Sequence, residues 1–130
     1  MFTALNAGAI GVQMNDLQEG IAKARRGGFA GVEFRIAEVA DLIDRHGADH
    51  VRGLFAAGGV RPAAWGLGLS WQEEADWRAS LAALPRLAAA AAAIDCRRTF
   101  MVLRPASNDR EYAENWRFHV ERLTPIAAIL

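Results

Sequence analysis

Two kinds of segment alternate along the chain. A short apolar run bounded by glycine or proline is followed each time by a longer segment whose apolar residues recur at helical spacing. The apolar runs are residues 4–12, 31–36, 62–69 and 99–104. Their starts lie roughly thirty residues apart, which is the length typical of a strand-and-helix repeat. The pattern therefore predicts four strands, each followed by a helix.

The first two helical segments have recognisable ends. Residues 15–19 offer capping side chains in front of the first helix, and Gly27 and Gly28 stop it. The second helical segment covers about residues 37–57, and Gly47 predicts an interruption within it.

The third helical segment contains a capping motif and a proline. Ser70 and Glu73 have the S-x-x-E spacing of a capping box, which predicts a helix that begins at Trp71. Pro85 predicts a kink or a division of this helix. Residues 87–93 are almost all alanine, so we expect this half to pack closely against the sheet.

The fourth helical segment begins near Asn108 and Glu111, which lie at cap spacing, and we expect a kink at Pro125. Its apolar stripe consists of Tyr112, Trp116, Val120 and Leu123. A stripe of this kind indicates a helix that packs on one face. We expect Trp116, like Trp77 on the third helix, to be a packing residue.

Strands that alternate with helices run parallel, because each helix carries the chain back across the sheet. An open doubly wound sheet and half of an eight-unit TIM barrel both satisfy this pattern. A nucleotide-binding open sheet would carry a G-x-G-x-x-G turn or a Walker lysine after the first strand, and residues 8–14 carry neither. We therefore predict an α/β fold, a partial TIM barrel in the form of a (βα)4 half-barrel with parallel strands.

The half-barrel is expected to form a single domain over residues 1–130, because no linker or composition shift divides the chain. The chain ends inside an apolar helix without a capping glycine. We therefore expect a barrel domain truncated after its fourth βα unit.

Composition limits the partners and the compartment. Fifteen basic residues balance fifteen acidic ones, so no overall field would attract nucleic acid, and we expect no nucleic-acid partner. The sequence shows neither a signal peptide nor a membrane span, which predicts no membrane partner. The single cysteine, Cys96, fits a reducing compartment, so we expect a cytoplasmic protein.

Two segments resemble a known family. Residues 28–34, Gly-Phe-Ala-Gly-Val-Glu-Phe, resemble the G-F-x-G-V/I-E segment that opens the second strand of the sugar phosphate isomerase/epimerase family, the xylose-isomerase-like TIM barrels. Residues 115–127 resemble the helix before the fifth strand of these barrels. The resemblance covers essentially the whole chain and about half of a complete member. It implies an isomerase or epimerase of carbohydrate metabolism that acts on a small sugar, sugar phosphate or polyol.

The resemblance also implies a divalent metal, Mn, Mg, Co or Zn, in the complete barrel. The family's ligands, a Glu, Asp, His and Glu set, come from the ends of strands five to eight, and this chain lacks those strands. No metal ligand or catalytic residue can therefore be carried over, and we predict no cofactor for this chain alone.

Candidate substrate-binding residues are sought at the carboxyl ends of the strands, where TIM barrels bind their substrates. Glu33 is a carboxylate within an apolar strand, and Arg35, two residues on, is available as its partner. This pair would either hold the barrel interior together or contact substrate. Asn6 in the first strand would either contact a sugar hydroxyl or satisfy neighbouring backbone groups.

Trp65 and Trp71 bracket the end of the third strand, and a tryptophan at a barrel mouth can stack on a sugar ring. Packing in the core is the alternative for both. Arg104, at the end of the fourth strand, is placed to hold a phosphate or carboxylate, or else lies in solvent.

Other reactive residues give weaker indications. His46 and His50 have the spacing of a zinc-binding pair but lack a third ligand, which favours a surface pair. His119 lies beside the apolar stripe of the last helix and is expected to be structural. Cys96 has neither a C-x-x-C partner nor a histidine close by in sequence, so thiol catalysis has little support.

A second hypothesis comes from a different class of protein. A (βα)4 half-barrel has open strand edges that must be covered, so the chain could be a non-catalytic module that forms a homo-oligomer and serves as a binding or scaffold protein. A third hypothesis, the apurinic endonuclease barrels, would need histidines near the ends of strands three and four, and residues 65–67 and 103–105 supply none.

Overall fold

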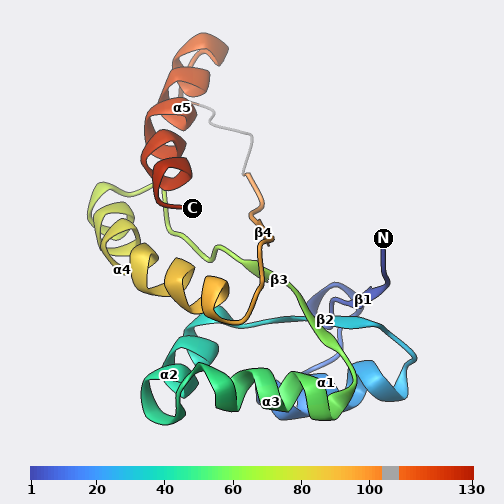
Figure 1. Cartoon of the computed structure of the whole chain (residues 1–130). Helices are drawn as coiled ribbons and strands as arrows, with labels where there is room; N and C mark the ends of the chain where they lie inside the picture. Colours follow the sequence, from blue (N-terminus) through green and yellow to red (C-terminus); the bar gives the residue numbers. More distant parts are fainter. Residues whose placement is uncertain (104–108) are drawn as a thin grey trace.

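The computed structural model describes residues 1–103 and 109–130. Within them, four parallel strands form one sheet in the order β1-β2-β3-β4, and one or two helices follow each strand (Figure 1). The strands are β1 (Ala4–Leu5), β2 (Gly31–Phe34), β3 (Arg61–Gly66) and β4 (Thr99–Phe100). The helices are α1 (Leu17–Arg26), α2 (Ile36–His46), α3 (Ala48–Gly58), α4 (Glu74–Ala93) and α5 (Tyr112–Ile129), with a short 3-10 turn at Gly8–Ile10.

The two faces of the sheet differ in their surroundings. Val32 and Phe34 of β2 are buried, and the Phe34 ring lies edge-on to Phe55 of α3 with centroids 5.8 Å apart. Glu33, between them, points to the other face and is half-buried. Helices α1, α2 and α3 lie together on one side of the sheet (Figure 1). One face is therefore packed and the other open, as in the wall of a barrel.

Close helix contacts hold the packed layer together. A Cβ atom added to Gly58 of α3 would lie 2.1 Å from Cγ2 of Ile21, so α1 and α3 approach where no side chain fits. Helix α4 packs on α2, and Arg86 joins the two helices through Asp41 at 2.7 Å and Asp44 at 2.5 Å.

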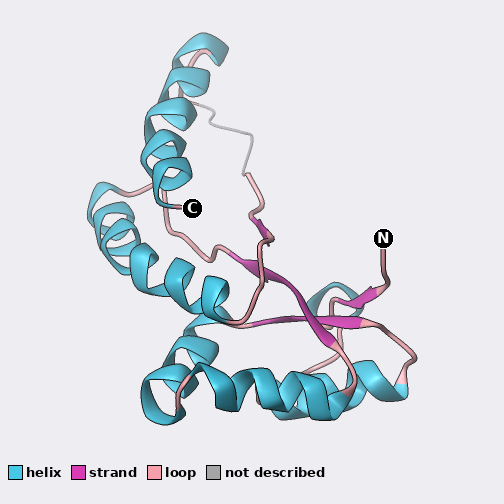
Figure 2. Cartoon of the chain, in the orientation of Figure 1, coloured by secondary structure: helices cyan, strands magenta, loops and turns pink. Residues whose placement is uncertain are grey.

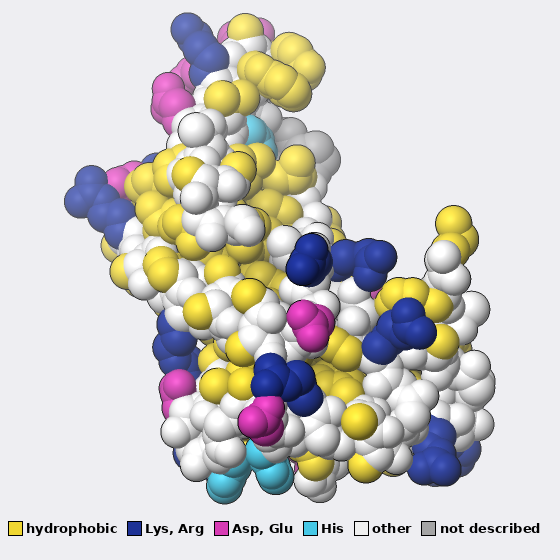
Figure 3. Space-filling view, viewed as in Figure 1, with side chains coloured by type: hydrophobic (Ala, Val, Ile, Leu, Met, Phe, Trp, Pro, Cys, Tyr) yellow, Lys and Arg dark blue, Asp and Glu magenta, His cyan; other side chains and the backbone are white. Residues whose placement is uncertain are grey.

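Helix α5 extends beyond the sheet and contacts α4 (Figure 2). Trp77 of α4 donates its indole N–H to the carbonyl oxygen of Arg122 at 3.2 Å. Arg122 also pairs with Glu74 at 2.5 Å, and this guanidinium is the main reason that the pKa of the Glu74 carboxyl lies below its usual value. The part of the surface around α4 and α5 carries many apolar side chains (Figure 3).

The four-repeat prediction is confirmed, and so is the interruption at Gly47, where α2 ends and α3 begins. The first strand is much shorter than the predicted residues 4–12, because the chain turns at Gly8–Ile10 and Gly11 takes a left-handed φ of 69°. The fourth strand is likewise shorter than predicted. No helix in the described residues is long and apolar enough to cross a membrane.

The predicted start of the third helix is wrong by three residues. Ser70 makes no cap, and its backbone N–H instead donates to the hydroxyl of Ser80 at 3.2 Å. Glu73 is the residue in front of the helix, with an extended backbone and no capping hydrogen bond from its side chain. Residues 70–73 are therefore a loop tied to α4.

The prolines do not divide their helices. Pro85 lies inside α4 and Pro125 inside α5, and both helices continue past them. A proline removes one backbone donor, and burial of a neighbouring side chain can outweigh that loss. Leu84, which precedes Pro85, is completely buried, and the predicted inward packing of the alanine-rich half is confirmed by the burial of Ala90 and Ala91.

Candidate functional site

A cleft opens at the carboxyl ends of β3 and β4. It has a volume of about 400 Å³ and is lined by residues 66–73, by Asp76 and by residues 100–102. Loops that follow parallel strands form the substrate sites of TIM barrels, so the cleft lies at the end of the sheet where function is expected. The carboxylates of Glu73 and Asp76 are its charged groups.

Glu33 lies on the open face of the sheet and faces Ala64 of β3 across a register shift between Val32 and Glu33. Bulges of this kind re-aim side chains and are common beside active sites. Loss of contact with water raises the pKa of the Glu33 carboxyl above its usual value. In the part of the chain that the structure describes, Glu33 is thus a carboxylate without an ion-pair partner, on the face that would line a barrel interior.

Asn6 directly follows β1, at the same end of the sheet as Glu33 of β2. Leu5 is the last residue of β1 and pairs with Val32 of β2, so Asn6 and Glu33 are the next residues of two neighbouring parallel segments. The side-chain oxygen of Asn6 accepts the backbone N–H of Ala9 at 2.9 Å and thereby holds the turn after β1. Its amide nitrogen carries two further N–H donors.

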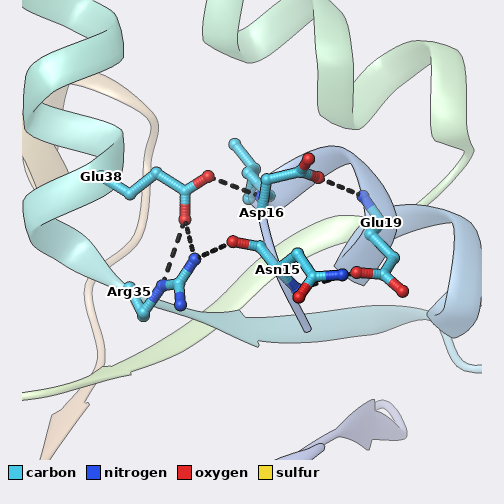
Figure 4. A network of polar contacts seen from close by, with 6 residues as sticks. Asn15, Asp16, Glu19, Arg35 and Glu38 are labelled. Atoms are coloured by element: carbon cyan, nitrogen blue, oxygen red, sulfur yellow. Dashed lines mark hydrogen bonds and ion pairs between the residues drawn. The ribbon is translucent and has the colours of Figure 1, made fainter. Parts of the chain in front are cut away.

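The predicted Glu33–Arg35 pair is wrong. Strand β2 ends at Phe34, and Arg35 takes the position in front of α2, so the strand alternation no longer applies to it. Its guanidinium pairs instead with Glu38 at 3.0 Å and also donates to the carbonyl oxygen of Asn15 (Figure 4).

Glu38 extends this network to the start of α1. Its second oxygen accepts the backbone N–H of Leu17 at 2.7 Å, while Asp16 accepts the N–H of Glu19 at 2.7 Å and caps the same helix (Figure 4). The network fastens the loop after β1 to the start of α2. Arg35 therefore positions two loops at the mouth of the half-barrel.

The two candidate tryptophans occupy different environments. Trp65 is 2% exposed and belongs to the hydrophobic core, which is the packing alternative. Trp71 lines the cleft, and its ring packs against His119 and Phe118 of α5 with centroids 4.7 and 6.3 Å away. Trp71 thus links the cleft to the last helix.

Neither the histidines nor Cys96 line the cleft, although His119 packs against the cleft residue Trp71. The rings of His46 and His50 lie 4.9 Å apart on the surface. His119 places its Nδ1 2.7 Å from the carbonyl oxygen of Asn115, while its buried Nε2 has no hydrogen-bond partner in the described residues. Cys96 is buried, and burial raises the pKa of its thiol, which opposes thiolate chemistry.

Metal donors do not gather in the described ranges, 1–103 and 109–130. No group of three or more His, Cys, Asp or Glu side chains there could hold a metal ion. Arg104, the candidate anion-binding residue, lies outside the described residues.

Sequence reasoning missed Gln72, Glu73 and Asp76 as residues of the cleft. The S-x-x-E spacing predicts a helix start at Trp71, so the predicted loop between β3 and α4 is too short. A usable signal was present, because Gly66 and Gly68 precede these polar residues, and glycines after a strand indicate a loop.

The chain is similar in fold to several solved structures. Neither a protein-family model nor a curated protein matches the sequence. A xylose isomerase domain protein from Alicyclobacillus acidocaldarius subsp. acidocaldarius is 25% identical and superposes with a TM-score of 0.61, over 88% of this chain and 44% of that one.

Two D-psicose 3-epimerases show the same relationship. One, solved in the presence of D-fructose, is 19% identical with a TM-score of 0.63, over 88% of this chain and 43% of that one. The other, from Clostridium cellulolyticum H10 and solved with D-tagatose, is 16% identical with a TM-score of 0.60, over 89% of this chain and 43% of that one. The chain spans less than half the length of each of these proteins.

Proposed function

Because the chain has the fold of half a xylose-isomerase-like TIM barrel, we propose that its strand ends form part of the binding site for a small sugar or polyol in an isomerase or epimerase of that fold. The observation that carries the proposal is the position of Glu33. Its carboxylate lies on the open face, loss of water raises its pKa, and no cation of residues 1–103 or 109–130 forms an ion pair with it. Asn6 follows β1 at the same end of the sheet. We also propose a cytoplasmic location, because Cys96 is a free thiol and free thiols are usual in a reducing compartment.

Sugar recognition explains this arrangement chemically. A carboxylate that has lost water but gained no partner accepts hydrogen bonds strongly, and a sugar hydroxyl is a donor of suitable size. The amide nitrogen of Asn6 would donate to a second hydroxyl. The carboxylates of Glu73 and Asp76 line the cleft and would accept further hydroxyl groups, while Trp71, 5% exposed, forms a buried part of the same wall.

Arg35 and Trp65 support the site in other ways. Arg35 has its guanidinium engaged by Glu38 and Asn15, so it positions the loops. Trp65, buried in the core, fixes β3. A substrate role for Arg104 remains part of the proposal, as a cation that would hold a phosphate or carboxylate of the substrate.

The divalent metal of the complete barrels has no counterpart in the described residues. The donors in these ranges do not form a group that fits a metal ion. We therefore expect the chain by itself to bind Mn²⁺, Mg²⁺, Co²⁺ or Zn²⁺ weakly at most, and sugar binding by the chain must depend on its own polar side chains.

Nuclear magnetic resonance titration of the chain with D-fructose and with D-tagatose tests the proposal. We expect the sugar to change the amide chemical shifts of residues at the ends of β1, β2 and β3. Glu33→Gln should weaken sugar binding roughly tenfold, because it loses a charge-assisted hydrogen bond. Glu114→Gln, an exposed carboxylate on α5, is the matched control and should bind like the parent chain. Shifts scattered over the surface, or equal binding by Glu33→Gln, would refute the assignment of this site.

A further inference from the structure

Three side chains meet at the amino ends of the strands, at the opposite end of the sheet from the proposed sugar site. The guanidinium carbon of Arg61 lies 4.8 Å from the centre of the Phe2 ring, and that of Arg98 lies 5.5 Å from it. Phe2 precedes β1, Arg61 is the first residue of β3, and Arg98 directly precedes β4. Residues far apart in the sequence therefore place two cations on one aromatic ring.

The backbone of the sheet fixes the position of this ring. The carbonyl oxygen of Thr3, next to Phe2, accepts the N–H of Gly31 at 3.0 Å, and the carbonyl oxygen of Arg98 accepts the N–H of Trp65 at 3.2 Å. The Phe2 ring lies over Gly31, where an added Cβ would come within 2.6 Å of the ring. Because glycine leaves this space free, the ring lies directly against the sheet between the two arginines' segments.

The two guanidinium groups have no acidic partner in the part of the chain that the structure describes. Neither Arg61 nor Arg98 forms an ion pair there, and both side chains are exposed. The ring attracts each cation through its π face but has no net charge, so the two cations still repel one another. Several Lys and Arg side chains lie close together near the N-terminus of the chain (Figure 3).

We propose that Arg61 and Arg98 together bind the phosphate group of a small ligand at the amino end of the sheet. Arginine donates parallel N–H groups to phosphate oxygens, and both long side chains are free to turn towards one anion. A phosphate monoester carries a charge of about −1.5 to −2 at neutral pH, which matches two guanidinium groups. Such an anion would remove the repulsion between the two cations.

Nuclear magnetic resonance titration of the chain with sodium phosphate tests the proposal, with the ionic strength held constant by sodium chloride. We expect the side-chain N–H signals of Arg61 and Arg98 to shift and to reach saturation. Arg61→Gln and Arg98→Gln should each raise the dissociation constant for phosphate about threefold to fivefold, as expected for exposed charge pairs. Phe2→Leu removes the aromatic ring and should act in the same direction.

Arg117→Gln is the matched control, because it removes an exposed arginine of α5 and should leave phosphate binding unchanged. A second titration with D-fructose 6-phosphate identifies the source of the phosphate group. Tighter binding at the same two arginines would indicate a sugar phosphate, and equal binding would indicate free phosphate.

Two outcomes overturn the phosphate site. One is a set of shifts that grow linearly with phosphate without saturation, and the other is unchanged binding by both Arg61→Gln and Arg98→Gln. The sugar titration reports on the carboxyl ends of the strands, so either proposal can fail without the other.

Discussion

The carboxylate of Glu38 accepts the backbone N–H of Leu17 at 2.7 Å, and so a side chain of α2 satisfies the first turn of α1. The same carboxylate pairs with Arg35, which holds the loop before α1 through Asn15 (Figure 4). The start of one helix thus depends on a residue from the next repeat. This dependence joins the first two βα units at the end of the sheet where the proposed site lies.

Replacing Glu38 tests this connection. Glu38→Ala leaves the N–H of Leu17 without its partner and removes the anion beside Arg35, so we expect a loss of about 2 kcal/mol in the free energy of unfolding. Urea denaturation followed by circular dichroism measures it. Asp49→Ala breaks the exposed pair with Arg52 and should change the stability much less. Equal losses in the two variants would contradict the bridging role of Glu38.

Replacing each of two glycines of α3 by alanine should change the stability of the protein in opposite directions. Nothing lies within 4 Å of a Cβ at Gly53, so Gly53→Ala should stabilise the protein by about 0.5–1 kcal/mol through helix propensity. At Gly58 the added carbon would collide with the buried side chain of Ile21. Gly58→Ala should therefore destabilise by about 1–3 kcal/mol. Thermal unfolding of the two variants and the parent chain measures these changes. A Gly58→Ala variant more stable than the parent would mean that α1 and α3 are not in such close contact.

The raised pKa of the Glu33 carboxyl predicts a pH-dependent stability. Folding disfavours the ionised form, so the native state holds this proton to a higher pH than the unfolded chain does. The ionised Glu33 therefore lowers the free energy of unfolding. This loss of stability is absent below the usual glutamate pKa, grows as the pH rises towards the pKa of Glu33 in the folded protein, and is complete above that pKa. Glu33→Gln should therefore have a higher melting temperature than the parent chain at neutral pH.

The difference between Glu33→Gln and the parent should shrink as the pH falls below the ordinary titration range of glutamate. Thermal melts across acidic to neutral pH measure it, and Glu114→Gln serves again as the control. A difference that does not vary with pH would show that Glu33 acts through packing and not through its charge.

Trp71 should anchor α5 to the rest of the fold. Its ring lies against Phe118 and His119, and it is 5% exposed. Trp71→Ala should cost about 3–5 kcal/mol in stability, as expected for a buried tryptophan. Hydrogen exchange should show the largest loss of protection in α5 and little change in α1. Uniform loss over the whole chain would contradict a local anchoring role.

The order of the helices and strands and their fourfold repetition can be predicted from the sequence alone. Apolar periodicity and glycines are local signals of secondary structure. The capping residues and Gly27 predict the two ends of α1, and Gly47 predicts the break between α2 and α3. The same signals misplaced the start of α4, because the S-x-x-E spacing of Ser70 and Glu73 also occurs in a loop that is tied to Ser80.

Which side chains contact one another, and which faces are buried, depends on how the elements pack in three dimensions. Arg35 pairs with Glu38 and not with Glu33, because β2 ends at Phe34 and the alternation of side chains between the two faces of the sheet does not extend to Arg35. Trp65 and Trp116 have the same side chain, yet one is buried in the core and the other stands in solvent. Periodicity shows that a residue belongs to an apolar face, but only the elements packed against that face determine whether it is buried.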